Sequence, residues 1–267
     1  WISVAGLFSI QPSEIVKLTF LFYLAAWLEK RGDTGIRDVH GGLLPFIGTL
    51  GIILGLLFLQ PDVGTMTIIA ATALVVYFVA GAPLLFVGGL IGAGALSLAA
   101  LIGLAPYRAA RFTTFLNPEL DPQGIGYHIN QALLAIGSGG ILGVGYGHSR
   151  QKFQYLPEVA GDSIYAVIGE EMGMLVAVLV LVAFLAFLWR TFKIASESPD
   201  RFGRYVAVGV GTWIVLQAFV NIGSMVAIMP MTGIPLPLIS YGGTSMAMTM
   251  CAVGVVLNIS RYGKGKE

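Results

Sequence analysis

The sequence predicts an all-α, polytopic membrane protein with about seven transmembrane helices. Its mean hydropathy is +0.84 and only 11% of its residues are charged, values typical of helical membrane proteins. Two uncharged runs, 63–107 and 205–260, extend over 45 and 56 residues. Because one membrane span needs about 20 residues, each of these two runs must contain two spans.

The expected spans follow one another along the chain, with short turns between most of them. The first begins at Pro12, because proline suits the first turn of a helix, and ends near Leu28. Gly81-Ala82-Pro83 and the proline-rich stretch 230–237 divide the two longest runs. The other spans are predicted at Leu43–Gln60, Gly64–Ala80, Leu84–Leu104, Ser163–Trp189, Tyr205–Ile228 and Leu238–Leu257. All belong to one integral membrane domain over residues 1–267, with a long loop at about 105–162.

The basic residues predict the orientation of these spans. Ten of the 15 Lys and Arg residues fall on one side of this topology, which is therefore expected to be cytoplasmic. The long loop 105–162 then lies outside the cell membrane. The ten residues are Lys30, Arg31, Arg37, Arg190, Lys193, Arg201, Arg204, Arg261, Lys264 and Lys266.

The uncharged segment His128–Val144 could be counted as a further span. Counting it would put the later basic clusters on opposite sides of the membrane, against the charge rule. Its Gln, Asn, Ser and glycine residues also suit an interfacial or re-entrant piece. We therefore interpret this segment as part of the outer loop.

Several classes of chemistry are excluded by the residue patterns. The single cysteine, Cys251, lies in an apolar run, so neither a disulfide framework nor a redox motif is expected. The chain has no metalloprotease, nucleophile-elbow or P-loop motif, and its three histidines, His40, His128 and His148, are too scattered to predict a metal site. The chain begins at Trp1, not Met, so we expect that its natural N-terminus is missing.

Ionisable residues gather between Gly137 and Glu171. Six charged side chains fall within the 24 residues from His148 to Glu171, about twice the density of the whole chain. Asp162 directly precedes an apolar helix, where it can act as the helix N-cap. Alternatively it can be a general base, because a carboxylate in low-dielectric surroundings has its pKa raised toward neutrality.

Two further groups in this region carry opposite charges. Arg150 and Lys152 follow alternating glycines at 143, 145 and 147, which suit close approach to an anion such as pyrophosphate; binding to anionic lipid headgroups is the alternative. Glu170 and Glu171 lie about two turns into the next helix, where isolated carboxylates are costly. One of them could face a polar cavity and pair with Lys17, but their roles are left unassigned.

Three other places interrupt the apolar pattern. Glu14 and Lys17 are three residues apart and share a helix face, as part of a site or as an interfacial ion pair. In 60–65, Asp62 is expected to cap the next helix after a proline turn. The stretch 230–245 contains three prolines and several glycines, so it forms either a stiff re-entrant corner or the wall of a site.

Taken together, these motifs resemble the SEDS family (shape, elongation, division and sporulation), which includes FtsW, RodA and SpoVE. The matching segments extend over essentially the whole chain. The stretch SRQK (149–152), inside one of the segments, and the closing LNISR (257–261) are most similar to the division branch, FtsW. The six segments are QPSEIVKL (11–18), LQPDVGT (59–65), DPQGIGYHINQALLAIGSGG (121–140), GVGYGHSRQKFQYLPE (143–158), GDSIYAVIGEEMG (161–173) and MPMTGIPLPLISYGGTS (229–245).

The resemblance implies a ten-helix fold in a bacterial plasma membrane, of which this chain matches the last seven helices. It implies a peptidoglycan glycosyltransferase of cell division and cell-wall synthesis, which polymerises lipid II at the extracytoplasmic face with Asp162 as its acidic catalytic residue. Inverting transfer releases undecaprenyl pyrophosphate and needs one base. Residues expected to bind substrate are Glu14, Lys17, Arg150, Lys152, Glu158, Ser240, Tyr241 and Gly242.

The resemblance also leaves alternatives and one departure. No cofactor is required by the residues, although a divalent cation (Mg or Mn) could neutralise the diphosphate in place of Arg150, Lys152 or Lys17. The implied partners are a class B penicillin-binding protein and other divisome proteins, and no nucleic acid. A lipid II flippase and a non-catalytic divisome scaffold are the alternative functions. Many relatives carry His-Thr where this chain has Ala160 and Gly161.

Overall fold

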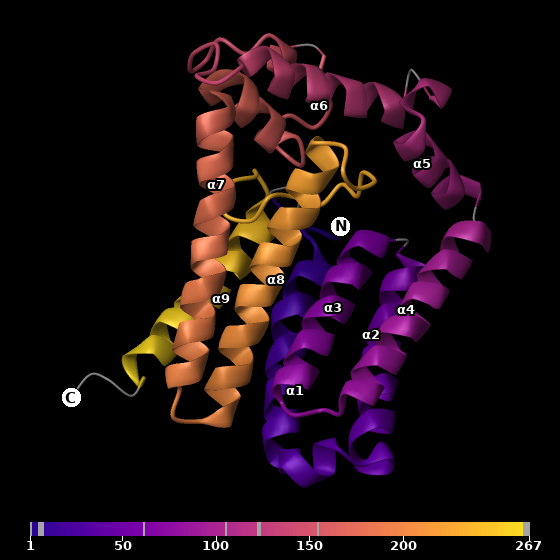
Figure 1. Cartoon of the computed structure of the whole chain (residues 1–267), viewed down its shortest axis with the longest axis vertical. Helices are drawn as coiled ribbons and strands as arrows, with labels where there is room; N and C mark the ends of the chain where they lie inside the picture. The colour runs from indigo at the N-terminus through magenta and orange to yellow at the C-terminus, as the bar shows by residue number, and fades with distance from the viewer. Residues whose placement is uncertain are drawn as a thin grey trace. The chain divides into compact units, whose positions relative to one another are not determined.

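A computed structural model describes residues 2–4, 8–60, 62–104, 106–121, 124–153 and 155–263. Helices occupy all seven predicted spans (Figure 1). They are α1 (Pro12–Ile36), α2 (Leu44–Leu59), α3 (Val63–Val79), α4 (Leu84–Leu104), α7 (Ile164–Glu197), α8 (Arg201–Met225) and α9 (Gly243–Arg261). Among the described residues, α7, α8, α9 and the helix formed by α2 with the preceding turn η1 (Val39–Leu43) are long and apolar enough to cross a membrane. The protein is therefore an all-α, multi-pass membrane protein.

The observed boundaries differ from the predicted ones mainly at three ends. Helix α1 ends eight residues past Leu28, with a break at Gly32 (φ 64°), and α7 ends as far past Trp189; both extensions are charged segments that lie outside the predicted apolar spans. Helix α9 begins at Gly243, not Leu238, since the prolines of 230–237 keep the preceding chain out of helical geometry. Two basic residues of the predicted cytoplasmic cluster, Lys264 and Lys266, lie outside the described residues.

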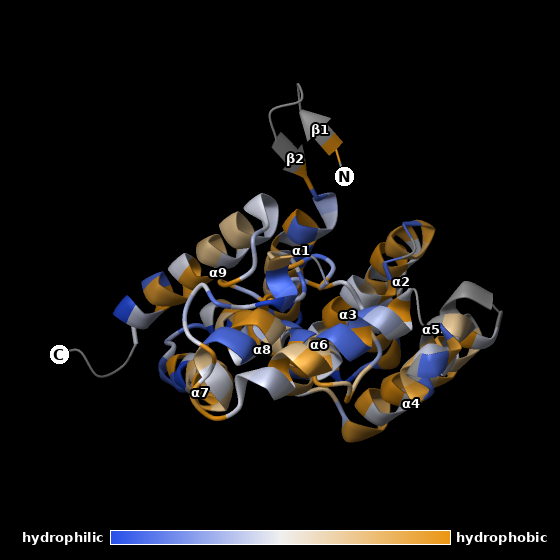
Figure 2. Cartoon of the chain, turned by 90° about the horizontal axis from the view of Figure 1, so that it is seen from above, coloured by the Kyte–Doolittle hydropathy of each residue, from blue (hydrophilic) through white to orange (hydrophobic). Residues whose placement is uncertain are grey.

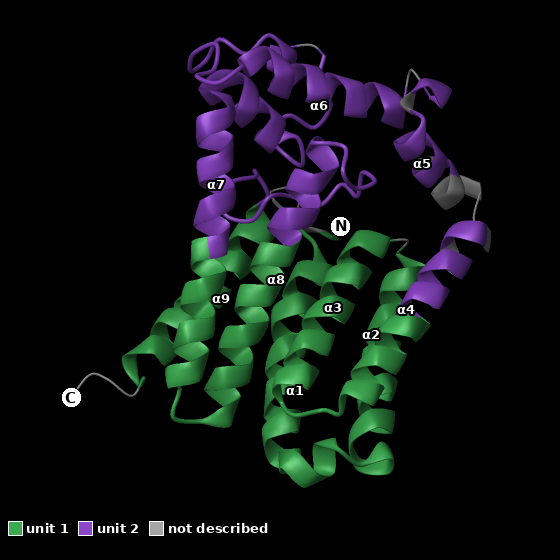
Figure 3. Ribbon diagram, in the orientation of Figure 1, with its two compact units in different colours: residues 1–93, 186–216, 243–267 green, residues 94–185, 217–242 purple. Residues whose placement is uncertain are grey.

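The chain forms two compact units, shown in Figure 3. Unit 1 contains residues 1–93, 186–216 and 243–267, and unit 2 contains residues 94–185 and 217–242. Each is described here by itself. The single membrane domain expected over 1–267 stays a prediction.

In unit 1, α1 packs against α3 and α9, and a short hairpin of β1 (Ile2–Val4) and β2 (Phe8–Ile10) precedes α1. The buried ring of Tyr77 stacks on Phe46 at a centroid distance of 4.3 Å, and its hydroxyl donates to the Ile36 carbonyl. Apolar side chains such as Ile52 and Leu56 are exposed on α2, which is coloured mainly hydrophobic in Figure 2. This is the pattern expected of a helix whose outer face meets lipid.

The long loop predicted at 105–162 is largely structured, and it belongs to unit 2. It contains α5 (Pro106–Leu116), α6 (Ile125–Gly139) and two short 3₁₀ turns, η2 (Pro118–Leu120) and η3 (Gln151–Phe153). Helix α6 covers most of the segment that we predicted to lie outside the spans. It has 15 residues, fewer than a span needs, and Figure 1 shows it running crosswise to α7.

Helix α7 is broken at Gly173, and the loop after α6 fits into the break. Gly173 has a positive φ of 79°, and the carbonyls of Glu170 and Glu171 accept hydrogen bonds from the N–H groups of Val144 and Gly145, each at 3.0 Å. Side chains at positions 143 and 173 would collide with the opposite backbone. The glycine at 143 therefore allows close approach to α7, a role that we had assigned to ligand binding.

Candidate active site

Asp162 lies directly before α7, but it does not cap that helix. The helix begins at Ile164, and the carbonyl of Ser163 accepts the first hydrogen bonds of the helix, from the N–H groups of Ala166 (3.0 Å) and Val167 (3.4 Å). Ser163 therefore occupies the N-cap position. The interpretation of Asp162 as the N-cap is wrong, and its half-buried carboxylate does not take part in capping the helix.

The backbone around Asp162 is held by an amide side chain. Asn221 of α8, which is fully buried, donates from Nδ2 to the carbonyl of Asp162 at 2.7 Å and to the carbonyl of Ile234 at 2.8 Å. One side chain thus ties the start of α7 to the proline-rich connection. We did not predict this residue; it is one of only three amide side chains, with Gln217 and Asn258, in a 56-residue uncharged run, and that is the signal that could have found it.

The proline-rich connection contributes two more contacts to the same backbone. The Ser240 hydroxyl donates to the Gly161 carbonyl and accepts from the Leu236 N–H at 2.7 Å, and the Tyr241 N–H donates to the Ala160 carbonyl at 2.7 Å. A Cβ atom built at Gly233 would lie 3.9 Å from Asp162 Oδ2. Of the two interpretations of this stretch, the structure favours a wall that positions Asp162. Gly242 follows at the end of this wall, and the Tyr241 ring is exposed.

Two ionisable side chains act on the Asp162 carboxylate. His128 of α6 lies with Nε2 2.6 Å from the Ser163 hydroxyl, and Glu158 is exposed in the turn that leads to Asp162. Burial raises the pKa of the Asp162 carboxyl, His128 opposes this increase by Coulombic attraction, and the Glu158 carboxylate adds to it. A raised pKa makes this carboxylate a better proton acceptor than an ordinary aspartate. The sequence analysis gave His128 no role of its own, and noted it as one of three scattered histidines that do not predict a metal site.

Glu170 and Glu171, which were unassigned, hold the loop that contains Arg150 and Lys152. Glu170 accepts from the Ser149 hydroxyl and, at 2.9 Å, from the Arg150 N–H. Glu171 forms an ion pair with Lys152 at 2.5 Å. The Arg150 side chain is exposed. In this arrangement Arg150 presents its charge outward, whereas the charge of Lys152 is already balanced.

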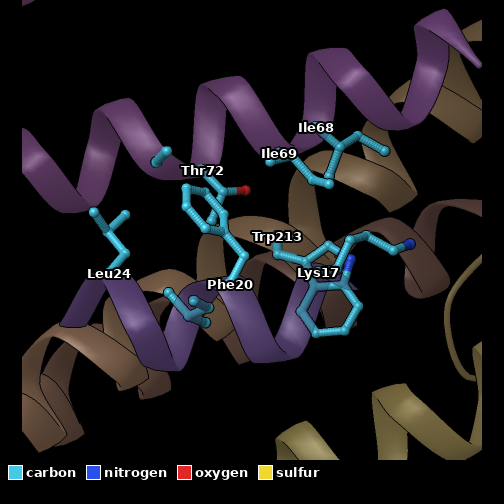
Figure 4. A pocket seen from close by; sticks show the side chains of 9 residues that line it. Lys17, Phe20, Leu24, Ile68, Ile69, Thr72 and Trp213 are labelled. Carbon is cyan, nitrogen blue, oxygen red and sulfur yellow. The ribbon is translucent and has the colours of Figure 1, made fainter. Parts of the chain in front are cut away.

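Glu14 and Lys17 lie on α1 and belong to unit 1. They form an ion pair at 2.7 Å in which each side chain is 2% exposed, so this is not the interfacial pair that the sequence also allowed. Lys17 Nζ lies 5.1 Å from the centroid of the Trp213 ring, and both line a small pocket between α1 and α3 (Figure 4). The second carboxylate oxygen, Glu14 Oε2, is buried without a hydrogen-bond partner among the described residues. Lys17 thus has Glu14 as its ion-pair partner, and its suggested pairing with Glu170 or Glu171 stays untested.

Asp62 and possible metal-binding groups are the remaining predicted features. Asp62 caps α3, accepting from the Thr65 N–H at 3.0 Å, as expected. Within the described part of the chain, no group of three or more His, Cys, Asp or Glu side chains is arranged to hold a metal ion. The site therefore consists of a carboxylate, its two ionisable neighbours and a wall of main-chain anchors.

Comparison with known proteins shows the family of this chain. Residues 1–265 match the sequence model of FtsW, RodA and SpoVE proteins, which is described as "Cell cycle protein". The chain belongs to the FtsW/RodA/SpoVE family. It is 43% identical over 267 residues to stage V sporulation protein E of Bacillus subtilis (strain 168), covering 99% of this chain and 72% of that protein. A second relative is the "Probable peptidoglycan glycosyltransferase FtsW" of Thioalkalivibrio sulfidiphilus (strain HL-EbGR7), which is 44% identical over 98% of this chain.

The family fold is also seen in solved structures. A chain in the structure described as "Structural coordination of polymerization and crosslinking by a peptidoglycan synthase complex" matches with a TM-score of 0.78 and 31% identity, covering 99% of this chain and 74% of that one. The chain spans only 66% of the length of the T. sulfidiphilus relative. Activity, substrate and partners are therefore taken up as a proposal.

Proposed function

We propose that this protein is a peptidoglycan glycosyltransferase, which polymerises lipid II into glycan strands. The observation that carries the proposal is Asp162: a half-buried carboxylate at the start of a membrane helix, whose backbone is fixed by Asn221, Ser240 and Tyr241 while its own oxygens stay out of the capping. Its family supports the same conclusion, because curated relatives at about 40% identity are named as probable peptidoglycan glycosyltransferases.

The reaction can be written as one displacement with inversion. Asp162 accepts the proton of the acceptor sugar hydroxyl, the hydroxyl oxygen forms a bond to C1 of the donor, and the bond from C1 to the diphosphate oxygen breaks. The electron pair of that bond leaves with undecaprenyl pyrophosphate. One base is sufficient, since an inverting transfer needs no covalent intermediate with the enzyme.

The leaving diphosphate needs neutralisation of its charge. Arg150 is available for this role because its side chain is exposed, whereas Lys152 would first have to leave Glu171. Ser240, Tyr241 and Gly242 would act by fixing the position of Asp162. A divalent cation bound to the diphosphate is a further source of charge, and no residues of this chain are assigned to it.

We further propose that Asp162 faces the extracytoplasmic side and that the protein works with a transpeptidase of the class B penicillin-binding proteins. The distribution of Lys and Arg supports the orientation. The partner is supported by the solved structure of a peptidoglycan synthase complex in which a similar chain occurs. Residues that would dock the partner are not assigned.

Lipid II translocation is the second candidate. The buried Glu14–Lys17 pair favours it, because ion pairs inside membrane helices often mark transport pathways. A transporter is expected to move labelled lipid II across vesicles even when Asp162 is replaced.

One experiment separates these functions. Purified protein and its Asp162→Asn variant are given lipid II, and glycan strands are resolved on a gel. We expect strands from the wild type and a loss of about 10²–10⁴-fold in the variant, the range of a general base. Equal strand yield from both proteins would refute the polymerase. Translocation by both proteins, with strands from neither, would favour the flippase.

A further inference from the structure

The imidazole of His128 is fixed next to Asp162 by a short chain of hydrogen bonds. His128 lies on α6, 35 residues before Ser163, and its Nε2 is 2.6 Å from the Ser163 hydroxyl oxygen. The same hydroxyl lies 2.7 Å from the Pro157 carbonyl and 3.4 Å from Asp162 Oδ1. The Ser163 side chain thus connects the imidazole to the residue beside it, Asp162.

The donors and acceptors of this chain determine where the imidazole proton lies. A carbonyl oxygen can only accept, so the Ser163 hydroxyl donates to Pro157, its closest acceptor apart from the imidazole. The only hydrogen of this hydroxyl is then donated to Pro157, so the hydroxyl oxygen can only accept from His128. The short contact therefore requires Nε2–H as the donor. Nδ1 is therefore the nitrogen that gains or loses a proton.

The charges that act on His128 are both negative. They come from Asp162 and Glu158, in the connection that leads into α7. Burial lowers the pKa of the His128 imidazole, and the two carboxylates only partly oppose this effect. The imidazolium therefore forms on the acidic side of the ordinary histidine range, where its charge acts on the two carboxylates.

We propose that His128 is a positioning residue for the proposed reaction: it holds Ser163 through Nε2–H and, when it is protonated under acidic conditions, its charge keeps the adjacent Asp162 ionised. This inference rests on the proposed function. No bond to His128 changes during the displacement.

The first test is the pH profile of lipid II polymerisation by His128→Gln. Glutamine can still donate to Ser163 but cannot carry a charge, so the proton affinity of Asp162 should rise. We expect the acid limb of the profile to move to higher pH, with a severalfold loss of rate on that limb and recovery at higher pH. Glu158→Gln removes a like charge and should move the same limb to lower pH. A purely structural role predicts that His128→Gln lowers the rate equally at every pH.

A second readout does not depend on activity. The chain has three histidines, and their imidazole signals can be titrated by NMR in lipid nanodiscs and assigned with His40→Gln and His148→Gln. Replacing Asp162 by Asn should lower the pKa of His128, and the signals of His40 and His148 serve as the internal reference.

The outcomes separate this inference from the proposed function. If Asp162→Asn is inactive and His128→Gln has the wild-type pH profile, the inference fails and the polymerase stands. If the His128 pKa does not change in Asp162→Asn, the inference fails even when His128→Gln cannot be purified. If Asp162→Asn polymerises lipid II like the wild type, both fail.

Discussion

Asp162 and Glu14 are both acidic residues at the start of a long apolar helix, yet the structure treats them differently. Glu14 has its counter-charge in the same helix, three residues on, where Lys17 pairs with its Oε1 at 2.7 Å. Among the described residues Asp162 forms no ion pair; its backbone is held by residues distant in the chain, and its carboxylate lies 3.4 Å from the Ser163 hydroxyl and is attracted by His128. A carboxylate paired within its own helix stabilises that helix, whereas one whose position is set by other groups can exchange a proton.

The largest effect should come from breaking the Glu14–Lys17 pair. Lys17→Met leaves the Glu14 charge buried without its cation, and we expect a loss of about 3–5 kcal/mol in the free energy of unfolding. Thermal unfolding in detergent measures this. The double variant Glu14→Gln/Lys17→Met removes both charges and should recover most of the stability. Equal losses in the single and double variants would show that the loss of stability does not come from the unpaired Glu14 charge.

The next effect concerns the anchor of Asp162. Asn221→Ala leaves the carbonyls of Asp162 and Ile234 without a buried donor, and each such loss costs about 1–3 kcal/mol. Strand synthesis should fall as well, because the carboxylate loses its position. Ser224→Ala, one turn further along α8, removes a hydroxyl bonded only within its own helix and serves as the matched control. Full activity in Asn221→Ala would contradict the anchoring role.

A smaller effect is expected at the ion pair of the loop at 149–152. Lys152 is 25% exposed and Glu171 is 7% exposed, so water screens part of their attraction. Lys152→Gln should cost up to about 1 kcal/mol of stability, and Lys152→Arg should restore it. Unfolding at low and high salt measures the pair. A loss as large as that of Lys17→Met would mean that the two pairs are equivalent.

The smallest effect has the opposite sign: replacing Asp162 should slightly increase the stability of the protein at neutral pH. Because the folded-state pKa of Asp162 is raised, its protonated form contributes stability that is complete below the unfolded pKa and is lost as the pH rises through the folded pKa. Asp162→Asn lacks this loss. The variant should therefore match the wild type at acidic pH and be slightly more stable at neutral pH. Melting temperatures of the wild type and the variant across this pH range measure the difference. A variant that is less stable than the wild type at neutral pH would show that the Asp162 carboxylate stabilises the fold.

These contrasts also show what the sequence could predict. The spans followed from long uncharged runs, and the Glu14–Lys17 contact followed from a spacing of three residues on one helix. The anchors of Asp162 did not, because Asn221 and Ser240 reach it across 59 and 79 residues, and His128 reaches Ser163 across 35. No local sequence pattern indicates contacts between residues so far apart in the chain. The N-cap was misplaced for a different reason: Asp162 and Ser163 are both good N-cap residues, and only the observed start of the helix at Ile164 shows that Ser163 takes that position.

The pH dependence of kcat/KM for lipid II polymerisation tests the central claim most directly. If the carboxylate of Asp162 is the proton acceptor, the rate falls as the pH is lowered through a pKa above the ordinary range of aspartate, because burial raises the pKa of this group. A profile without an acid limb, or one whose limb lies in the ordinary aspartate range, would contradict the account.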